Sequence, residues 1–556
     1  MTTAVQPGRQ HDRLSAWAPL RNTVFAALFA AQLGSNIGSF FQSVAAAWLM
    51  GDLSTSPTLV ALIQTATLLP VLLLGLVAGA LADIVDRRKL LLATQGWMVS
   101  CAGALAALTL LDLVTPSVLL ALTFAMGMGA ALMGPAWQAI QPDLVPANEF
   151  PQAVALSSLT FNVGRAVGPA LGGALVAAAG PGWAFVVNAA SFLGVMSVLV
   201  WWQPHQERVR LPPERLPGAV RIGWRYGVNA PVLRAVLVRT AAFAPAAAAI
   251  QALLPTVVRD RLGMGSGAYG LLLACFGVGA ASAALLRPRL DLKLSPDRLL
   301  FFCALVVAGA LVVVGTMRSI APIGVALFIA GAAWTTGTVT TNVATQRALP
   351  WWVRARGIGL YMLVLSGGIA IGSAVWGGIA AWSIPAAHLA AAATLAIGAT
   401  TVFRWRLNVV HGLDLTPATP TEPMVNLEPE PGDGPVLVTV SYRVPPERQT
   451  EFVTMMRRVQ RDRLRSGADQ WGLFHDLADT DVFLETFLVA TWAEHLRQHH
   501  RRTVNADVTL RGAREFVEGD VAVAHFVSAY AEGELRPVMR DDPDPTSPTP
   551  PTPGGT

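Results

Sequence analysis

Long apolar runs separated by short connections are the feature that most constrains this chain. A membrane-spanning helix needs roughly 20 mainly apolar residues, and twelve such runs precede Arg406. Proline, glycine and charged residues divide them, at 22–50, 59–82, 89–111, 117–139, 150–178, 183–202, 233–256, 268–286, 298–317, 320–342, 357–381 and 386–403. This pattern predicts an all-α polytopic membrane domain with twelve transmembrane helices.

Charged residues are distributed unevenly along the 556 residues. From Asn22 to Arg406, 34 of 385 residues are charged, about 9%, whereas from Pro435 to Leu535 the share is 27 of 101, about 27%. Soluble proteins carry about 25% charged residues. The first share excludes an ordinary soluble enzyme, and the second predicts a soluble domain that follows the membrane domain.

The positions of lysine and arginine predict the orientation of the spans. If the N-terminus is cytoplasmic, the cytoplasmic side collects 21 Lys and Arg residues, and the opposite side has three, Arg259, Arg261 and Arg318. Loops rich in these residues stay in the cytoplasm, so we expect both termini there. Topology explains the basic residues, and no nucleic-acid partner is expected. The first 20 residues lack the pattern of a removable signal peptide, so we expect the first span to direct membrane insertion.

The longest internal connection divides the spans into two groups of six. The predicted segments are a cytoplasmic N-terminal segment (1–21), a first bundle (22–202), a cytoplasmic central loop (203–232) and a second bundle (233–406). A shift of 204 residues superimposes Pro146 on Pro350, Gly164 on Gly368, Gly168 on Gly372 and Gly173 on Gly377. Two parallel six-span halves around a central cavity are a recognised transporter plan, and in this the chain resembles the major facilitator superfamily.

The connection after the second span carries a motif of that superfamily. It reads Gly79-Ala-Leu-Ala-Asp83-Ile-Val-Asp86-Arg87-Arg88-Lys89, with Asp86 where the family usually has glycine. Glycine permits close helix packing, and the arginines can pair with carboxylates or lipid phosphates. The resemblance implies that Gly79, Asp83, Arg87 and Arg88 form a gating loop that stabilises one access state; the alternative is a plain basic turn.

A glycine-rich motif in the fifth span indicates the direction of transport. Gly164, Gly168, Pro169, Gly172 and Gly173 form a GxxxGPxxGG pattern similar to that of family members that export by proton antiport. Small residues let helices approach closely, and the proline frees a backbone carbonyl. The resemblance favours export over uptake, although Ala155 stands where a further glycine is expected.

Arg165 lies slightly past the middle of the fifth span. An ionised side chain near the bilayer centre costs at least ~2.5 kcal/mol, so it is expected to face the bundle interior. It can attract an anionic group of the substrate or pair with a gating carboxylate; the alternative is that it reaches an interface. Arg239, two turns into the seventh span, is expected to extend its charge to the interface.

The acid needed for proton coupling is not obvious, because no Asp or Glu occupies the middle of a span. Asp83 and Glu149, near cytoplasmic ends, are the coupling candidates, together with Arg165. Uncharged amides suit a neutral, lipophilic or amphipathic ligand, although each is more often an interhelical hydrogen bond. The substrate-binding candidates are therefore Arg165 and the amides Gln32, Asn36, Gln42, Gln64, Gln138, Asn162, Gln251 and Asn342.

The stretch from Gly134 to Pro146, together with the fifth-span motif, narrows the resemblance. It is similar to the branch of enterobactin-exporter-type proteins and transmembrane secretion effectors. This implies a secondary transporter, not an enzyme, in the inner or plasma membrane of a bacterium. It would export a drug, siderophore or secondary metabolite by alternating access, with protons as the coupling ion and membrane lipid as its other partner.

The C-terminal region predicts a small soluble domain. A proline-rich acidic linker (407–434) leads to a β-α-β-β-α-β pattern at 435–535, which is a ferredoxin-like arrangement, and to a disordered tail (536–556). Segments 463–471 and 492–499 resemble the antibiotic-biosynthesis-monooxygenase type of fold, which implies a homodimer. Alternatively, this domain is the main active part, an oxygenase or a ligand sensor.

Metal ligands are not expected in either part of the chain. Cys101, Cys275 and Cys303 lie in apolar runs without ligand spacing. His495 and His499 are one helical turn apart, but the sequence places no third ligand beside them, and a solvated helix face is the favoured interpretation. We therefore expect no metal and no cofactor.

Overall fold

The structure is a computed structural model that describes residues 15–202, 226–407 and 429–535. Within these ranges, positions 147, 228, 292–293, 351, 529 and 532–533 are not described. Outside them, positions 416, 418 and 425 are described. The chain forms two compact units. The helical unit lies within Met1–Leu349 and Val353–Gly412, and the α+β unit consists of Pro350–Trp352 and the described residues of Leu413–Thr556.

Several predicted connecting segments fall mainly outside the described residues. These are most of the N-terminal segment (1–14), most of the central loop (203–225), much of the linker (408–428) and the predicted tail (536–556). Within the loop motif, the burial of Gly79 and the side chain of Asp83 also lie outside the described part of the chain.

The helical unit consists of long helices, as the apolar runs predict. They are α1 (Thr23–Leu53), α2 (Pro57–Ile84), α3 (Arg87–Leu110), α4 (Pro116–Leu144), α5 (Phe150–Ala179), α6 (Pro181–Trp201), α8 (Pro231–Ala247), α9 (Ala249–Thr256), α10 (Ser266–Asp291), α11 (Pro296–Thr316), α12 (Ile320–Arg347), α13 (Arg354–Ala380) and α14 (Ile384–Ala399). Short helical turns η1 (Ala18–Arg21), η2 (Val257–Arg261) and η3 (Thr400–Phe403) accompany them.

Eleven stretches of the described helices are long and apolar enough to cross a membrane. One of them, Pro231–Arg261, is built from α8, α9 and η2. The 30-residue α5 is not among the eleven, because its glycines, Asn162 and Arg165 lower its hydropathy. The multispanning helical character is thus confirmed.

Proline and polar capping residues define the helix boundaries. Pro57, Pro116 and Pro181 stand at the first position of their helices, where the missing backbone N–H removes no hydrogen bond. The Asn22 side chain accepts hydrogen bonds from the backbone N–H groups of Val24 and Phe25 at the start of α1. Such caps satisfy amides that a helix leaves unpaired.

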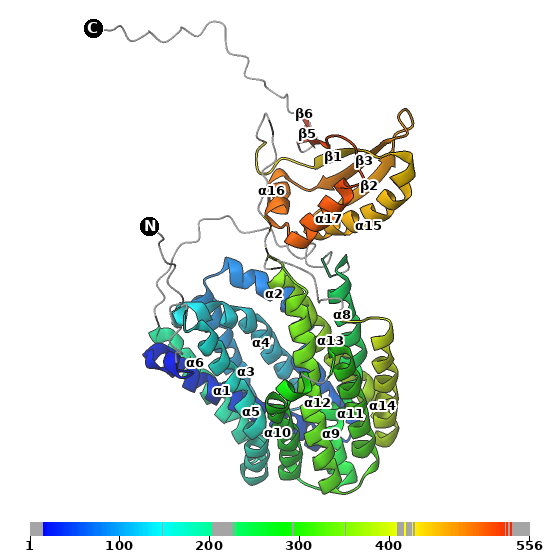
Figure 1. The fold of residues 1–556 in the computed structure, drawn as a ribbon. Coiled ribbons are helices and arrows are strands. Elements are labelled where there is room, and N and C mark those ends of the chain that lie inside the picture. The colour runs from blue at the N-terminus through cyan, green and yellow to red at the C-terminus, as the bar shows by residue number, and fades with distance from the viewer. Residues whose placement is uncertain are drawn as a thin grey trace, which may run out of the picture. The chain divides into compact units, whose positions relative to one another are not determined.

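The helical unit is divided into two halves (Figure 1). The first half, α1 to α6, runs from blue to cyan, and the second, α8 to α14, from green to yellow-green. The most extensive contacts between the halves are those of α2 with α13 and of α5 with α10. A continuous apolar core extends through both halves and includes Phe185, Leu253 and Trp334.

The α+β unit contains one four-stranded antiparallel sheet. Its main elements are β1 (Val436–Arg443), α15 (Gln449–Ser466), β2 (Gln470–His475), β3 (Val482–Val489), α16 (Trp492–His500), α17 (Val504–Arg514) and β4 (Ala522–Val527). A short turn η5 (Pro446–Arg448) and the small strands β5 (Tyr530–Ala531) and β6 (Glu534–Leu535) complete it. The strand order is β2-β3-β1-β4.

Alternation along the strands sets the core of this unit. Along β1, buried residues alternate with partly buried ones, the period expected of a sheet with one covered face. Phe452, Met456 and Val459 of α15 pack against that face. This helix is therefore amphipathic, with one face in the core of the unit.

A buried carboxylate, Glu485, is the polar centre of the α+β unit. It is fully buried on β3 and accepts hydrogen bonds from Tyr442 Oη at 2.7 Å, Trp471 Nε1 at 2.9 Å and Arg463 Nε at 3.0 Å. Burial by itself raises the pKa of Glu485, but the charge and hydrogen bonds of Arg463, with those of Tyr442 and Trp471, bring it below its ordinary value.

Candidate transport site

The glycines of α5 bring it into close contact with α1. A Cβ atom at Gly164 would lie 3.0 Å from Cβ of Asn36, and one at Gly168 would lie 2.6 Å from Cβ of Phe40. Gly172, one turn further along α5, faces the Cα atom of Phe41 in the same way, at 3.1 Å. The small residues therefore permit backbone contact, as the motif predicts.

Other residues of the same motif contact the second half. A Cβ atom at Gly173 would lie 2.7 Å from Cα of Gly270 on α10. Pro169 has no N–H to donate to the carbonyl of Arg165, four residues earlier. That carbonyl instead faces α10 at Gly277, where a Cβ atom would lie only 2.2 Å from the oxygen. The freed carbonyl is thus covered by glycine of the other half, in a geometry that suits a Cα–H···O contact.

The repeated glycines of α13 occupy equivalent places in the second half. Gly368 and Gly372 face Pro245 of α8, the first helix of that half, as Gly164 and Gly168 face α1. Gly377 faces Ala61 of α2 in the first half, where a Cβ atom would lie 2.6 Å from the alanine Cβ. The sequence repeat therefore corresponds to equivalent helix contacts in the two halves. Within each half, α5 contacts α1 and α13 contacts α8; between the halves, α5 contacts α10 and α13 contacts α2.

Arg165 lies at the middle of α5, where the two halves meet. It is 15 residues from Phe150 and 14 from Ala179, which is about 22 and 21 Å along the helix axis. Its guanidinium lies over the ring of Phe276 on α10, with Cζ 5.4 Å from the ring centroid. Within the described part of the chain, no carboxylate forms an ion pair with it.

Aromatic rings extend this arrangement into the second half. Trp334 of α12 lies with its ring centroid 6.1 Å from that of Phe276 and 5.5 Å from that of Phe243 on α8. A cation next to a group of aromatic rings suits a ligand that combines aromatic surface with negative charge. The arginine could be predicted from the sequence but these rings could not, since apolar residues in a span give no signal of their own.

Two of the amide candidates are joined to each other. Gln32 Nε2 donates to Asn36 Oδ1 at 3.2 Å, and Asn36 Nδ2 donates to Thr160 Oγ1 of α5 at 3.0 Å. These two hydrogen bonds lie in the same α1–α5 contact as Gly164, one helical turn before it on α5. It links the candidate polar groups to the glycine motif.

The other amides do not gather at one place. Gln42 is buried and accepts from Asn188 Nδ2 of α6 at 3.4 Å, which is an interhelical hydrogen bond within the first half. Asn162 donates to the carbonyl of Ser158 on its own helix at 2.9 Å. Of the remaining candidates, Asn342 accepts from Gln346 at 2.6 Å, Gln138 is exposed, and Gln64 and Gln251 are half-buried.

The arginines of the loop motif bind carbonyls at helix ends. Arg88 donates from Nε to the carbonyl of Leu199 at 2.8 Å and from Nη2 to that of Val200 at 2.6 Å. Arg87 donates to the carbonyl of Ala139 at 2.9 Å and lies 3.7 Å from Asp143. Asp86, which replaces the usual glycine, caps α3 by accepting from the N–H of Lys89 at 2.9 Å.

The coupling candidates occupy ends of helices. Glu149 is half-buried at the N-cap position of α5, and its side chain forms no capping hydrogen bond there. The side chain of Asp83 lies outside the described residues.

A buried ion pair in the second half corrects one expectation. Arg239 does not extend to an interface: only 7% of it is exposed, and it pairs with Asp297 at the start of α11. Asp297 also accepts from the backbone N–H of Leu407 at 3.0 Å. This pair could not be predicted from the sequence, because Asp297 has the position of an ordinary helix-end acid and its partner is 58 residues away.

A second ion pair connects the halves at one end of the bundle. Arg259 of η2 pairs with Asp52 near the end of α1, and its guanidinium also lies over the Trp48 ring, with Cζ 5.2 Å from the centroid. The ring of Trp48 stacks at 6.3 Å from that of Tyr269 on α10. This end of the bundle, where α1 ends and α2 begins, is therefore closed by contacts between the halves.

Comparisons with known proteins agree with the fold and the motifs. The family model for the transmembrane secretion effector matches residues 14–533. Enterobactin exporter EntS of Salmonella choleraesuis (strain SC-B67) is 26% identical over 334 residues, which cover 56% of this chain and 75% of that protein.

Solved structures of transporters share the fold of this chain. A bacterial homolog of the human lysosomal transporter Spinster, in an inward-facing and unoccupied conformation, has a TM-score of 0.55 at 16% identity and covers 70% of this chain and 98% of its own. A POT family transporter in complex with 5-aminolevulinic acid has a TM-score of 0.57 at 11% identity, with 70% and 96% covered. This chain belongs to the transmembrane secretion effector family of the major facilitator superfamily, and it is a membrane transporter rather than an enzyme.

Proposed function

We propose that this protein exports a lipophilic or amphipathic small molecule, such as a drug, a siderophore or another secondary metabolite. The observation that carries the proposal is Arg165, a cation at mid-span depth between the two halves, beside the Phe276 ring. Keeping a charge at this depth is costly, which favours a functional role for it. The relationship to a protein named as an enterobactin exporter supports export of a compound of this class.

Alternating access is the proposed transport mechanism, and the contacts between the halves support it. Thr58 Oγ1 of α2 donates to the carbonyl of Gly377 on α13 at 3.0 Å, and Thr65 Oγ1 donates to that of Ala370 at 2.8 Å. With the ion pair of Asp52 and Arg259, these contacts gather toward the end of the bundle where α1 ends. With twelve spans and both termini in the cytoplasm, that end faces outward, so the conformation is closed to the exterior.

Proton antiport is the proposed driving reaction. It is supported by the α5 motif, whose glycines and proline form the contact with α10. Glu149 and Asp83 are the proposed proton carriers, because both lie near the cytoplasmic ends of helices that take part in contacts between the halves. The gating loop acts through Arg87 and Arg88, which fasten α3 to the ends of its neighbours.

Transport in proteoliposomes with an imposed pH gradient tests these claims. Enterobactin and the aromatic anion anilinonaphthalene sulfonate are suitable cargoes. A hydrogen bond to a charged group is worth about 1.5–3 kcal/mol, so we expect Arg165→Ala to weaken binding of an anionic cargo at least tenfold and Arg165→Lys to retain more. A transport rate that does not change with the pH gradient would refute proton antiport. Unchanged transport by Arg165→Ala would refute the role of Arg165 in binding the cargo.

For the α+β unit we propose a ferredoxin-like domain of the antibiotic-biosynthesis-monooxygenase type, in the segment 435–535. The β2-β3-β1-β4 antiparallel order supports this arrangement. The sheet face opposite the helices carries exposed apolar side chains, including Phe474 and Phe526, with 57% and 53% of their surface accessible. An apolar face of this kind supports homodimer formation through this unit.

A second candidate function places the main activity in the α+β unit, as an oxygenase or a ligand sensor. The buried polar network around Glu485 favours it, because such networks recur at functional sites. Oxygen consumption by the full chain with an aromatic polyketide-like substrate would support this candidate. Full transport by a chain that ends after position 434, with no oxygen consumption by the intact protein, would exclude it.

A further inference from the structure

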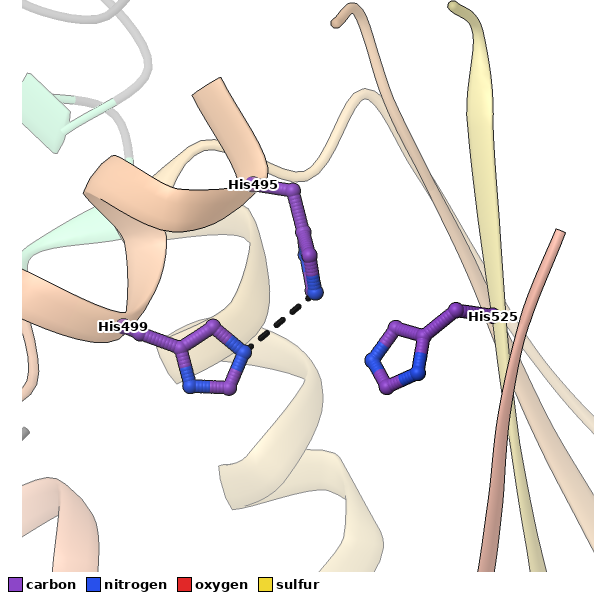
Figure 2. Close-up of side chains that lie close together, drawn as sticks. All are labelled: His495, His499 and His525. Atoms are coloured by element: carbon purple, nitrogen blue, oxygen red, sulfur yellow. Dashed lines mark hydrogen bonds between the residues drawn. The ribbon is translucent and has the colours of Figure 1, made fainter. Parts of the chain in front are cut away.

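Three histidines of the α+β unit converge on one point. His495 and His499 lie one turn apart on α16, and His525 lies on the edge strand β4. Figure 2 shows their rings turned toward a common space between the helix and the strand. The Nε2 atoms of His495 and His499 are 3.3 Å apart, and ligand nitrogens of all three residues lie within 4.8 Å of one another.

The structure corrects the expectation of a solvated helix face. Only 1% of His495 is exposed, and its ring centroid lies 5.3 Å from that of Trp492 and 4.9 Å from that of His525. His525 stands opposite Val438 of β1 in the sheet, so it lies on the face that carries the core. The third ligand that the sequence did not supply therefore comes from a strand 26 residues beyond His499.

The separations approach those of a tetrahedral zinc site. With Zn–N bonds of 2.0–2.1 Å, two ligand nitrogens of a tetrahedron are roughly 3.3–3.4 Å apart. The nitrogens of His495 and His499 already have this spacing. His525 would have to move inward by roughly 1.5 Å to complete the set, which is within the reach of a side-chain rotation.

The chemistry of the site favours a metal of intermediate softness. An imidazole that is not protonated keeps a lone pair on one ring nitrogen. Each of the three histidines can therefore offer one nitrogen to a metal ion at this point. Glu494, on the same helix, is engaged by Arg501 and Arg497. An all-nitrogen set suits Zn²⁺ and its neighbours in the first transition row and does not suit Mg²⁺ or Ca²⁺.

We propose that His495, His499 and His525 form a binding site for a divalent first-row transition metal ion, with Zn²⁺ as the reference ion. Three protein ligands leave a fourth coordination position for water or for a donor atom of a bound molecule. The site joins α16 to β4, which are otherwise held together through the core. Metal binding therefore stabilises the α+β unit and does not depend on the transport mechanism of the helical unit.

The experiment uses the full-length protein in detergent, incubated with Zn²⁺, desalted and measured for bound metal. We expect about one ion per chain, as for a site of three protein ligands, and an affinity at least roughly tenfold lower in His499→Ala and His525→Ala. His500→Ala is the matched control, because this neighbouring histidine is exposed at the end of α16 and outside the cluster. It should bind like the unmodified chain.

A second measurement keeps the proposal testable if a variant folds poorly. Co²⁺ added to the unmodified protein should give the intense visible absorption of tetrahedral cobalt, and Zn²⁺ should displace it, while Mg²⁺ should not. Metal content no higher than in a blank, or equal loss in His500→Ala and His525→Ala, would overturn the proposal. So would a cobalt spectrum of octahedral type that Mg²⁺ removes.

Discussion

The adjacent glycines Gly377 and Gly378 of α13 provide a direct test of the closed end of the bundle. A Cβ atom at Gly377 would lie 2.6 Å from Cβ of Ala61 and 3.2 Å from Cα of Thr58, both on α2 of the other half. A Cβ atom at Gly378 would meet nothing within 4 Å. Substitution of each by alanine therefore differs only in whether the two halves are pushed apart.

The expected magnitude follows from these distances. Carbon atoms in contact normally lie about 3.5–4.0 Å apart, so Gly377→Ala forces a local separation of about 1 Å. Overpacking of this kind costs about 1–3 kcal/mol, whereas the helix propensity gain of about 1 kcal/mol is common to both variants. The cost falls on the conformation closed at this end, which we expect to lose about 5- to 150-fold in population relative to Gly378→Ala.

Cysteine labelling measures this population. Ala47 is buried beside Pro255 and Arg259 at the closed end, so Ala47→Cys should react with a membrane-impermeant maleimide only when the halves separate. The three native cysteines are replaced by alanine to remove background. Labelling should be faster in Gly377→Ala than in Gly378→Ala by the factor given above. Equal rates in the two variants would refute the proposed contact between the halves.

Three further predictions concern stability. Asp297→Ala leaves the buried Arg239 charge unpaired, so we expect it to lower the free energy of unfolding by about 3–5 kcal/mol. The double variant Arg239→Met, Asp297→Leu should have a stability close to that of the unmodified protein. Thermal unfolding in detergent compares the two variants, and equal losses of stability would contradict the pairing. The pKa of Glu485 lies below its ordinary value, so ionised Glu485 stabilises the fold above about pH 4.5, and this stabilisation is lost as the pH falls through the lower folded-state pKa. Unfolding followed by tryptophan fluorescence should show that Glu485→Gln removes this pH dependence of stability. Arg88→Ala loses two hydrogen bonds to helix-end carbonyls and should lower stability by about 1–3 kcal/mol, whereas Lys89→Ala, at an exposed position, should change it by at most about 0.5 kcal/mol.

Much of the fold could be read from the sequence because each span is specified locally. A run of apolar residues, a proline at its start and a polar cap are features of neighbouring positions, so the helix ends at Pro57, Pro116 and Pro181 fall close to the predicted ones. α5 shows where local hydropathy fails. Its glycines and Arg165 keep it out of the stretches that are apolar enough to cross a membrane, yet these same residues build its contacts with α1 and α10.

The candidate site was predicted less completely, since it depends on contacts between distant segments. The sequence indicated Arg165 and the α5 glycines, but the Phe276 ring and the covering glycine Gly277 lie on α10, more than 100 residues away. Arg239 shows the same limit. Its burial depends on Asp297, which only packing brings to it.

The sequence by itself indicated the multispanning helical part, the α+β unit that follows it and the family motifs, because hydropathy, charge content and glycine spacing are properties of neighbouring residues. Only the tertiary structure decided which side chains share a site. His495 and His499 look like a solvated pair on one helix, and the fold turns them inward and adds His525 from the edge strand. Metal coordination, ion pairing and helix contact all depend on distances of a few ångströms between side chains. The number of residues between two positions does not determine these distances, whereas the packing of the fold does.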